Sequence, residues 1–191
     1  TLDTLRREHL GCYGYFRPTS PHIDALARDA LLFERALASM ASTLPSHLSL
    51  LTGLYAHQHG MTSNRRAAVV SFTSELGRLS AAEVLRRCGY RTAAFVSAMP
   101  LAPTTGIHAG FETYESPTAP QGASIRAGER NEAVLAWLAE HAADPGPLFL
   151  WVHYFDPHEP NDPVSPYDTM FASDFATDAA QREWIRARGV D

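Results

Sequence analysis

The sequence lacks an apolar run long enough to cross a membrane, because its longest one, Leu148–Val152, has only the length of a strand. Basic charge is also scarce: 16 lysines and arginines stand against 21 aspartates and glutamates, and the net charge at pH 7 is −5. Proteins that bind nucleic acid through its phosphates need a basic surface. We therefore expect no nucleic-acid partner and no membrane segment in this chain.

Cysteine is nearly absent. The two cysteines, Cys12 and Cys88, are too few for a disulfide framework or a cysteine-rich zinc site. They could form one disulfide, but two separate thiols are the commoner arrangement in a domain of this size. We expect separate thiols.

The 191 residues suffice for one globular domain with a hydrophobic core and are too few to require two. Thr1–Asp3 resembles the last residues of a strand, and Arg186–Asp191 ends without a closing element. We expect a single partial domain over residues 1–191, truncated at both ends.

Helical and strand patterns alternate along the chain, and the helices are signalled mainly by their ends. We expect helices from Ser20-Pro21 to about Ala30, from Pro45 to Thr52 before Gly53, from the capping box Ser80–Glu83 to about Gly89, and from about Ala127 to Ala142. Short apolar runs predict strands at 31–33, 92–96 and 148–152. Strands that are apolar on both faces and separated by helices favour an α/β fold with a parallel sheet covered on two sides.

In such sheets, ligands bind beyond the carboxyl ends of the strands. That rule selects Asp3, Thr43 and the segment His153–His158. A carboxylate in the place of Asp3 suits a divalent cation, although it could also serve as a cap. His153, Asp156 and His158 are consistent with metal ligation, with oxyanion contacts or with an exposed loop.

Thr43 places a hydroxyl just before a proline-started helix. Helix N–H groups and the helix dipole attract phosphate or sulfate to such a position. A hydroxyl held against a metal ion loses its proton more easily and can attack phosphorus or sulfur. The simpler alternative is a threonine that only caps the helix.

Eight blocks follow one another in an order that resembles the sulfatases of the alkaline-phosphatase superfamily. They are residues 3–6, 9–14, 20–27, 44–46, 49–55, 59–60, 89–93 and 151–158, and the resemblance extends from Thr1 to about Tyr167. It implies an alkaline-phosphatase-like sandwich of a mostly parallel sheet between helices, incomplete in this chain. It also implies a metal-dependent hydrolase of sulfate or phosphate esters, acting on a small-molecule, glycan or lipid ester.

By position, Asp3 matches a metal-binding aspartate, and Thr43 matches the nucleophile, which also contacts the metal ion. His158 and His153 match histidines near the sulfate or phosphate, and His47 replaces the arginine of the C/S-x-P-x-R pattern. Oxygen-rich ligation favours calcium, whereas added histidines would favour zinc or manganese.

The departures from this family pattern also carry information. Threonine has a methyl group on Cβ, so Thr43 cannot be oxidised to the formylglycine of active sulfatases. Thr43-Leu44-Pro45-Ser46-His47 is similar instead to the nucleophile block of nucleotide pyrophosphatase/phosphodiesterases, where threonine attacks phosphorus directly. We expect Thr43 to act in place of formylglycine, with phosphate esters preferred.

Two alternatives stay open: a phosphoryl-group transferase of the same superfamily, and a truncated non-catalytic domain. The Asp-His or Asp-Asn pair that completes the family's metal site is missing here, since Asp174 and Asp178 have no adjacent histidine. We therefore expect the isolated chain to be inactive.

Overall fold

A computed structural model describes residues 1–65, 71–75, 79–118, 124–171 and 179–187. The chain divides into two compact units, of which the first comprises Thr1–Asp3 and Leu37–Pro157 and the second Thr4–Ala36 and His158–Asp191. A single domain over residues 1–191 stays a prediction.

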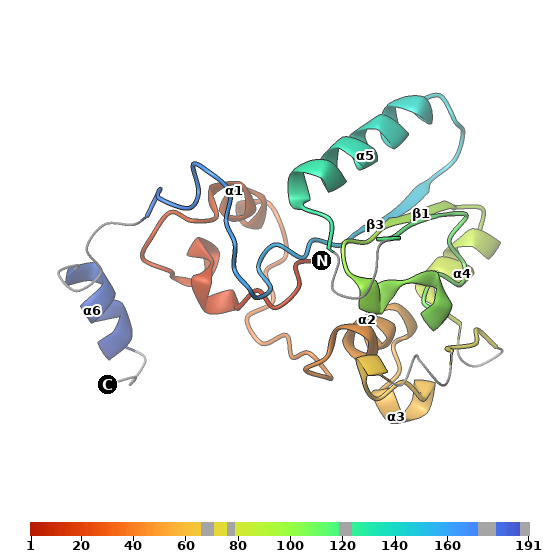
Figure 1. The fold of residues 1–191 in the computed structure, drawn as a ribbon, viewed down its shortest axis with the longest axis horizontal. Coiled ribbons are helices and arrows are strands. Elements are labelled where there is room, and N and C mark those ends of the chain that lie inside the picture. Colours follow the sequence, from red (N-terminus) through yellow and green to blue (C-terminus); the bar gives the residue numbers. More distant parts are fainter. Residues whose placement is uncertain (66–70, 76–78, 119–123, 172–178, 188–191) are drawn as a thin grey trace. The chain divides into compact units, whose positions relative to one another are not determined.

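The first unit is built on a parallel three-stranded sheet with the order β2-β1-β3 (Figure 1). The strands are β1 (Arg91–Phe95), β2 (Thr113–Glu115) and β3 (Leu148–Val152). β1 is central and pairs with β3 along its whole length, from Arg91↔Leu148 to Phe95↔Val152. The predicted α/β class and parallel sheet are confirmed.

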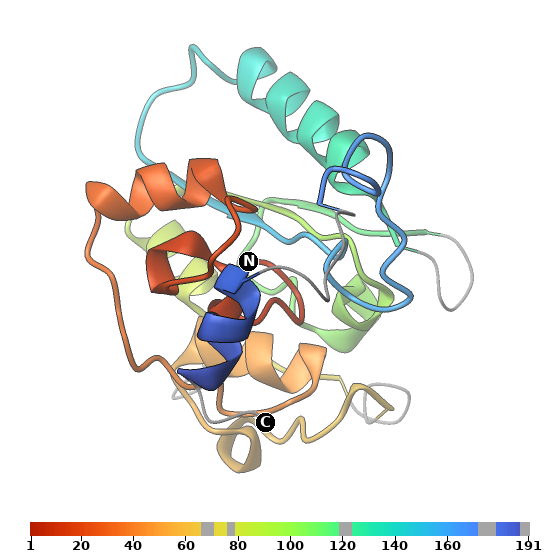
Figure 2. The same ribbon diagram turned by 90° about the vertical axis from the view of Figure 1, so that its left-hand side faces the viewer.

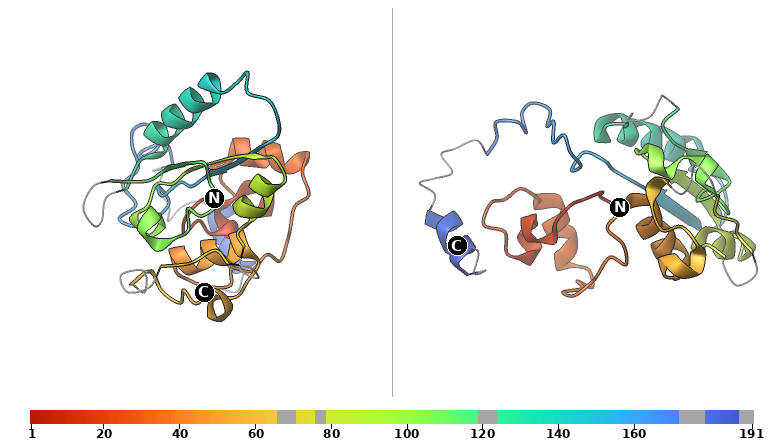
Figure 3. Two further views of the ribbon diagram at one scale, coloured as in Figure 1. Left: turned by 90° about the vertical axis from the view of Figure 1, so that its right-hand side faces the viewer. Right: turned by 60° about the horizontal axis from the view of Figure 1, so that its bottom comes forward.

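Helices cover both faces of this sheet, as Figure 1 and the left view of Figure 3 show. On one face lies α5 (Ala127–Glu140), where Val134 packs with Ala93 and Phe95 of β1. On the other lies α2 (Thr43–Thr52), whose buried leucines pack with Ala94, Val96 and Trp151. Because successive strand residues point to opposite faces, a strand covered on both faces favours apolar residues at consecutive positions, as in β3.

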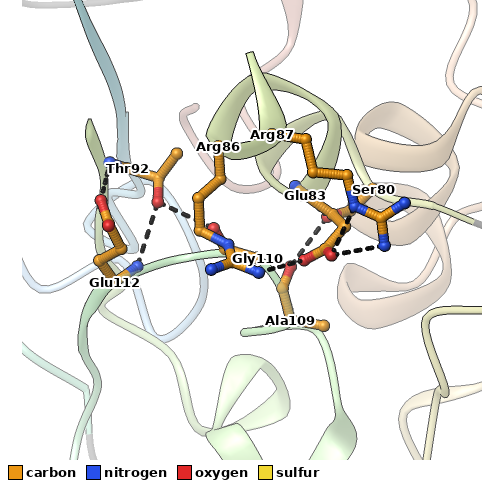
Figure 4. Close-up of polar contacts among 8 residues, drawn as sticks. All are labelled: Ser80, Glu83, Arg86, Arg87, Thr92, Ala109, Gly110 and Glu112. Carbon is orange, nitrogen blue, oxygen red and sulfur yellow. Dashed lines mark hydrogen bonds and ion pairs between the residues drawn. The ribbon is translucent and has the colours of Figure 1, made fainter. Parts of the chain in front are cut away.

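Polar contacts fasten α4 (Ala81–Arg87) to the sheet (Figure 4). Ser80 caps the helix as predicted: its Oγ accepts the Glu83 N–H at 3.1 Å and its hydroxyl donates to the Ala109 carbonyl at 2.8 Å. On β1, the Thr92 hydroxyl donates to the Gly110 carbonyl at 2.8 Å. These bonds hold the turn before β2 against both α4 and β1.

Shorter helical elements complete the first unit. They are α3 (Ala56–His59) and the 3-10 turns η4 (Met99–Leu101) and η5 (Pro103–Thr105). Within the described ranges, no helix is long and apolar enough to cross a bilayer.

The second unit contains α1 (Pro21–Arg28), drawn in red-orange in Figure 2, and α6 (Ala179–Arg186), drawn in blue. Two 3-10 turns, η1 (Arg7–His9) and η2 (Gly11–Tyr13), precede α1. α1 begins at Ser20-Pro21 as predicted, but none of its residues is buried. Trp184 of α6 packs edge-on against Tyr15, with ring centroids 5.6 Å apart.

The strand predicted at residues 31–33 is wrong, because this segment is irregular. Leu31 and Phe33 are 80% and 65% exposed, so their apolar character does not place them in a core. Side chains, not a neighbouring strand, bind the local carbonyls: the Tyr13 hydroxyl donates to Phe33 and the Arg7 guanidinium donates to Glu34.

Two other predictions have clear outcomes. Both cysteines are free, as expected; Cys12 is half-buried and Cys88 exposed.

The predicted helix start at Pro45 is two residues late, because α2 already begins at Thr43 with Ser42 in the N-cap position. Thr43 is thus the first helical residue and does not precede the helix.

Candidate functional site

Three polar side chains meet beyond the carboxyl end of β3. Leu2 forms a parallel bridge with Tyr154, so that Asp3 emerges beside His153, the residue after β3. The Thr43 hydroxyl donates to Asp3 Oδ2 at 3.2 Å, and His153 Nε2 lies 3.5 Å from the same oxygen. Asp3, Thr43 and His153 are 7%, 8% and 0% exposed. The structure therefore brings together Asp3, Thr43 and His153, and the ring of His47 packs against that of His153, with centroids 5.0 Å apart.

Thr43 lies in the first turn of α2, where the free N–H groups and the dipole of a helix favour an anion. The next N–H, that of Leu44, donates to Asn64 Oδ1 at 2.9 Å. Asn64 is a site neighbour that sequence reasoning missed. A single asparagine in a loop carries no pattern, and only the fold brings it to the start of α2.

His47 is hydrogen-bonded at both ring nitrogens. A carbonyl can only accept, so Nδ1–H donates to the Thr43 carbonyl at 2.8 Å and Nε2 accepts the Thr1 hydroxyl at 3.1 Å. Thr1 Oγ1 in turn accepts the indole N–H of Trp151 at 3.1 Å. The Thr1 hydroxyl thus connects His47 of α2 to Trp151 of β3.

The site is electrostatically polarised. Burial raises the pKa of Asp3, but the contact with His153, the charges of His153 and His47 and the Thr43 hydrogen bond outweigh it, so the pKa lies below its ordinary value. Burial lowers the pKa of His47 to about 4, despite the opposing hydrogen bond to Thr43. At neutral pH an ionised Asp3 therefore lies near a neutral His47.

His158 belongs to the second unit, and its Nδ1 lies 2.8 Å from the Glu159 carbonyl. Its expected place near the sulfate or phosphate stays a prediction. Asp174 and Asp178 lie outside the described residues.

The donor set fits part of a metal site. Asp3 Oδ2 and Thr43 Oγ1 offer two neighbouring oxygens, which suit calcium or another hard cation. Among the described residues, however, no group of three His, Cys, Asp or Glu side chains could hold a metal ion. A complete site would need ligands beyond these two.

A second hydroxyl–histidine pair, Ser49 and His59, has a structural explanation. His59 Nδ1 accepts the Met61 N–H at 3.2 Å, so its Nε2 carries the hydrogen and donates to Ser49 Oγ at 3.1 Å. His59 therefore cannot take a proton from Ser49. It fastens the turn after α3 to α2.

Residues 1–188 match the family model described as sulfatase. The chain is 33% identical over 163 residues to the N-sulphoglucosamine sulphohydrolase of Homo sapiens, covering 84% of this chain and 31% of that protein. It is 38% identical over 96 residues to the steryl-sulfatase of Mus musculus, covering 48% and 15%. The chain thus spans less than a third of the length of either relative.

Solved structures share the fold. The phosphonate monoester hydrolase of Agrobacterium radiobacter has a TM-score of 0.69 at 23% identity, covering 90% of this chain and 42% of that one. A protein in the alkaline phosphatase superfamily from Vibrio parahaemolyticus has a TM-score of 0.67 at 16% identity, covering 99% and 47%. The C-terminal periplasmic domain of EcEptC from Escherichia coli, in complex with Zn, has a TM-score of 0.63 at 19% identity, covering 96% and 52%. The alkaline-phosphatase-like fold expected from the sequence is confirmed, and the family model covers nearly the whole chain: it belongs to the sulfatase family.

Proposed function

We propose that the complete protein is a metal-dependent hydrolase of phosphate and sulfate esters, in which Thr43 is the nucleophile. The observation that carries this proposal is the contact between the buried Thr43 hydroxyl and the Asp3 carboxylate, 3.2 Å apart. The sulfatase family of the chain and its similarity to a steryl-sulfatase support ester hydrolysis.

Thr43 is well placed to attack. Its hydroxyl hydrogen points to Asp3, which leaves the oxygen lone pairs directed elsewhere and open to an incoming phosphorus or sulfur atom. The start of α2 favours the negative charge of the ester there. The attack forms a bond from Thr43 Oγ1 to phosphorus and releases the alcohol; water then hydrolyses the threonine ester and returns the hydroxyl.

Asp3 and Thr43 would supply two ligands of a divalent metal ion, calcium being the choice that oxygen ligands favour and zinc or manganese the alternatives. Such an ion, when bound, lowers the pKa of the threonine hydroxyl and neutralises charge on the ester. The ionised Asp3 carboxylate would keep the Thr43 hydroxyl and His153 Nε2 next to each other, because both contact its Oδ2. His153 would donate a hydrogen bond to an oxygen of the ester.

We further propose that phosphate esters are preferred over sulfate esters. Thr43 cannot become formylglycine, because its Cβ carries a methyl group. Residues 43–47 resemble the nucleophile block of nucleotide pyrophosphatase/phosphodiesterases, in which a threonine oxygen attacks phosphorus directly. Transfer of a phosphoryl group to an acceptor other than water stays an alternative outcome.

The test compares Thr43→Val with wild type in the full-length protein, using p-nitrophenyl phosphate and p-nitrophenyl sulfate. Valine keeps the shape of threonine and removes its hydroxyl, so turnover of both esters is expected to fall by at least about a hundredfold. Thr52→Val, at the other end of α2, is the matched control and should retain activity. Undiminished turnover by Thr43→Val would show that another group is the nucleophile. A higher kcat/KM for the sulfate in wild type would refute the phosphate preference.

A further inference from the structure

Arg130 of α5 is a fully buried cation that the proposed chemistry does not use. It is 1% exposed, although arginine is rarely buried to this degree. Its charge partner, Glu115, has a side chain that is 51% exposed and lies 3.4 Å away. Burying a guanidinium against so exposed a carboxylate is a poor source of stability, which raises the question of what else Arg130 does.

The contacts of Arg130 gather at the carboxyl ends of two strands. Its Nη2 donates to the Val96 carbonyl at 2.8 Å, and its Nε donates to Ser97 Oγ at 3.4 Å. Both acceptors belong to the residues that follow β1, and Glu115 ends β2. Arg130 therefore fixes the path of the chain where it leaves β1.

Ser97 connects this arrangement to the candidate site. Its main-chain N–H donates to His153 Nδ1 at 3.4 Å, and both residues are 0% exposed. A nitrogen that accepts a hydrogen bond carries no hydrogen in neutral imidazole. The hydrogen of His153 is then on Nε2, the atom that faces Asp3 at 3.5 Å.

We propose that Arg130 is a positioning residue: by holding Val96 and Ser97, it directs the Ser97 N–H at His153 Nδ1 and so fixes the tautomer in which Nε2–H points into the site. His153 then acts as a hydrogen-bond donor to an anionic oxygen. It is not a metal ligand, because a ligating Nε2 would place the hydrogen on Nδ1, against the Ser97 N–H. The inference deepens the proposed function, but its structural part holds whether or not Thr43 is the nucleophile.

The experiment is nuclear magnetic resonance of the full-length protein with ¹⁵N-labelled histidine, at an alkaline pH where histidine is neutral. The signals of His153 are assigned by their loss in His153→Gln. We expect wild type to show one hydrogen-bearing nitrogen, Nε2. Arg130→Met, which removes the guanidinium, should produce a mixture of both tautomers. Arg91→Met, at the opposite end of β1 where the arginine pairs with Asp144, is the matched control and should leave the His153 signals unchanged.

Two results would overturn the proposal: a hydrogen on Nδ1 of His153 in wild type, or an unchanged His153 tautomer in a folded Arg130→Met. If Arg130→Met does not fold, Arg130→Lys, which keeps a cation but not the Nε contact to Ser97, is judged by the same two criteria. Kinetics give a separate measure: kcat for p-nitrophenyl phosphate should fall about tenfold or more in Arg130→Met, with KM little changed. If Thr43→Val keeps full turnover while the tautomer responds as expected, the proposed nucleophile fails and the role of Arg130 stands.

Discussion

The hydroxyl of Thr43 donates a hydrogen bond to the carboxylate of Asp3, 3.2 Å away, although 40 positions separate the two residues in the sequence. Two separate features create this contact. The bridge between Leu2 and Tyr154 sets Asp3 at the carboxyl edge of the sheet, and the start of α2 points Thr43 toward it. The contact therefore forms only when the edge of the sheet and the start of α2 are both in place.

Replacing Asp3 by asparagine should weaken metal binding by the complete protein. The change removes the charged oxygen that contacts Thr43, and an uncharged amide is a poorer ligand for a hard cation. Calorimetric titration with calcium and with manganese should show at least about a tenfold loss of affinity. Asp144→Asn, which alters a surface ion pair with Arg91, serves as the control. Equal affinities for wild type and Asp3→Asn would show that Asp3 does not bind the metal.

The metal-free protein should lose stability as the pH falls from about 6.5 towards 4. The pKa of His47 is lowered to about 4 in the folded state, whereas unfolded histidine has a pKa near 6.5. Between these values the unfolded chain binds more protons, so the free energy of unfolding decreases as pH decreases. Urea unfolding in EDTA at several pH values measures this slope. His47→Gln should show a shallower slope than wild type, and identical slopes would contradict the assignment.

Gly110→Ala should destabilise the protein by at least about 2 kcal/mol, because two costs add. Gly110 has a φ of +93°, and an added Cβ would lie 2.3 Å from the backbone nitrogen of Glu83. Gly128 in α5 provides the matched control, since an added Cβ there meets nothing within 4 Å. Gly128→Ala should be neutral or slightly stabilising. Thermal unfolding distinguishes the two, and similar melting temperatures would refute the steric argument.

Ser80→Ala should cost roughly 1–2 kcal/mol of unfolding free energy, because it removes the cap of α4 and the hydroxyl that donates to the Ala109 carbonyl. Ser42→Ala tests the same position on α2, where the side chain makes no capping hydrogen bond. Its loss should be clearly smaller. Denaturant unfolding measures both variants, and equal losses would show that the cap of α4 is not the cause.

Sequence patterns predicted the elements whose signals are local. The capping box at Ser80, the Ser20-Pro21 start and the apolar run at Leu148–Val152 each gave an element close to the observed bounds. β2 went unpredicted, because Thr113–Glu115 has no apolar run and is a strand only through its pairing with β1. The strand predicted at residues 31–33 is wrong for the opposite reason: this segment is apolar, but it pairs with no strand among the described residues.

The site residues also differ in whether a local sequence pattern predicts them. Asp3, Thr43 and His153 were identified from local sequence patterns, because they lie at strand ends and at a helix start. The contacts of Asn64, Ser97 and Arg130 depend on distant segments, so no local pattern pointed to them.

The bridge between Leu2 and Tyr154 has a consequence for how the molecule forms. Asp3 can reach its place beside β3 only after the whole chain up to Tyr154 has been synthesised. Contacts between such distant residues close slowly, because the loop entropy must be overcome first. On the ribosome, α2 can form early with Thr43 already in place, but its carboxylate neighbour docks late. The order of synthesis thus keeps Thr43 separated from Asp3 until β3 has been synthesised.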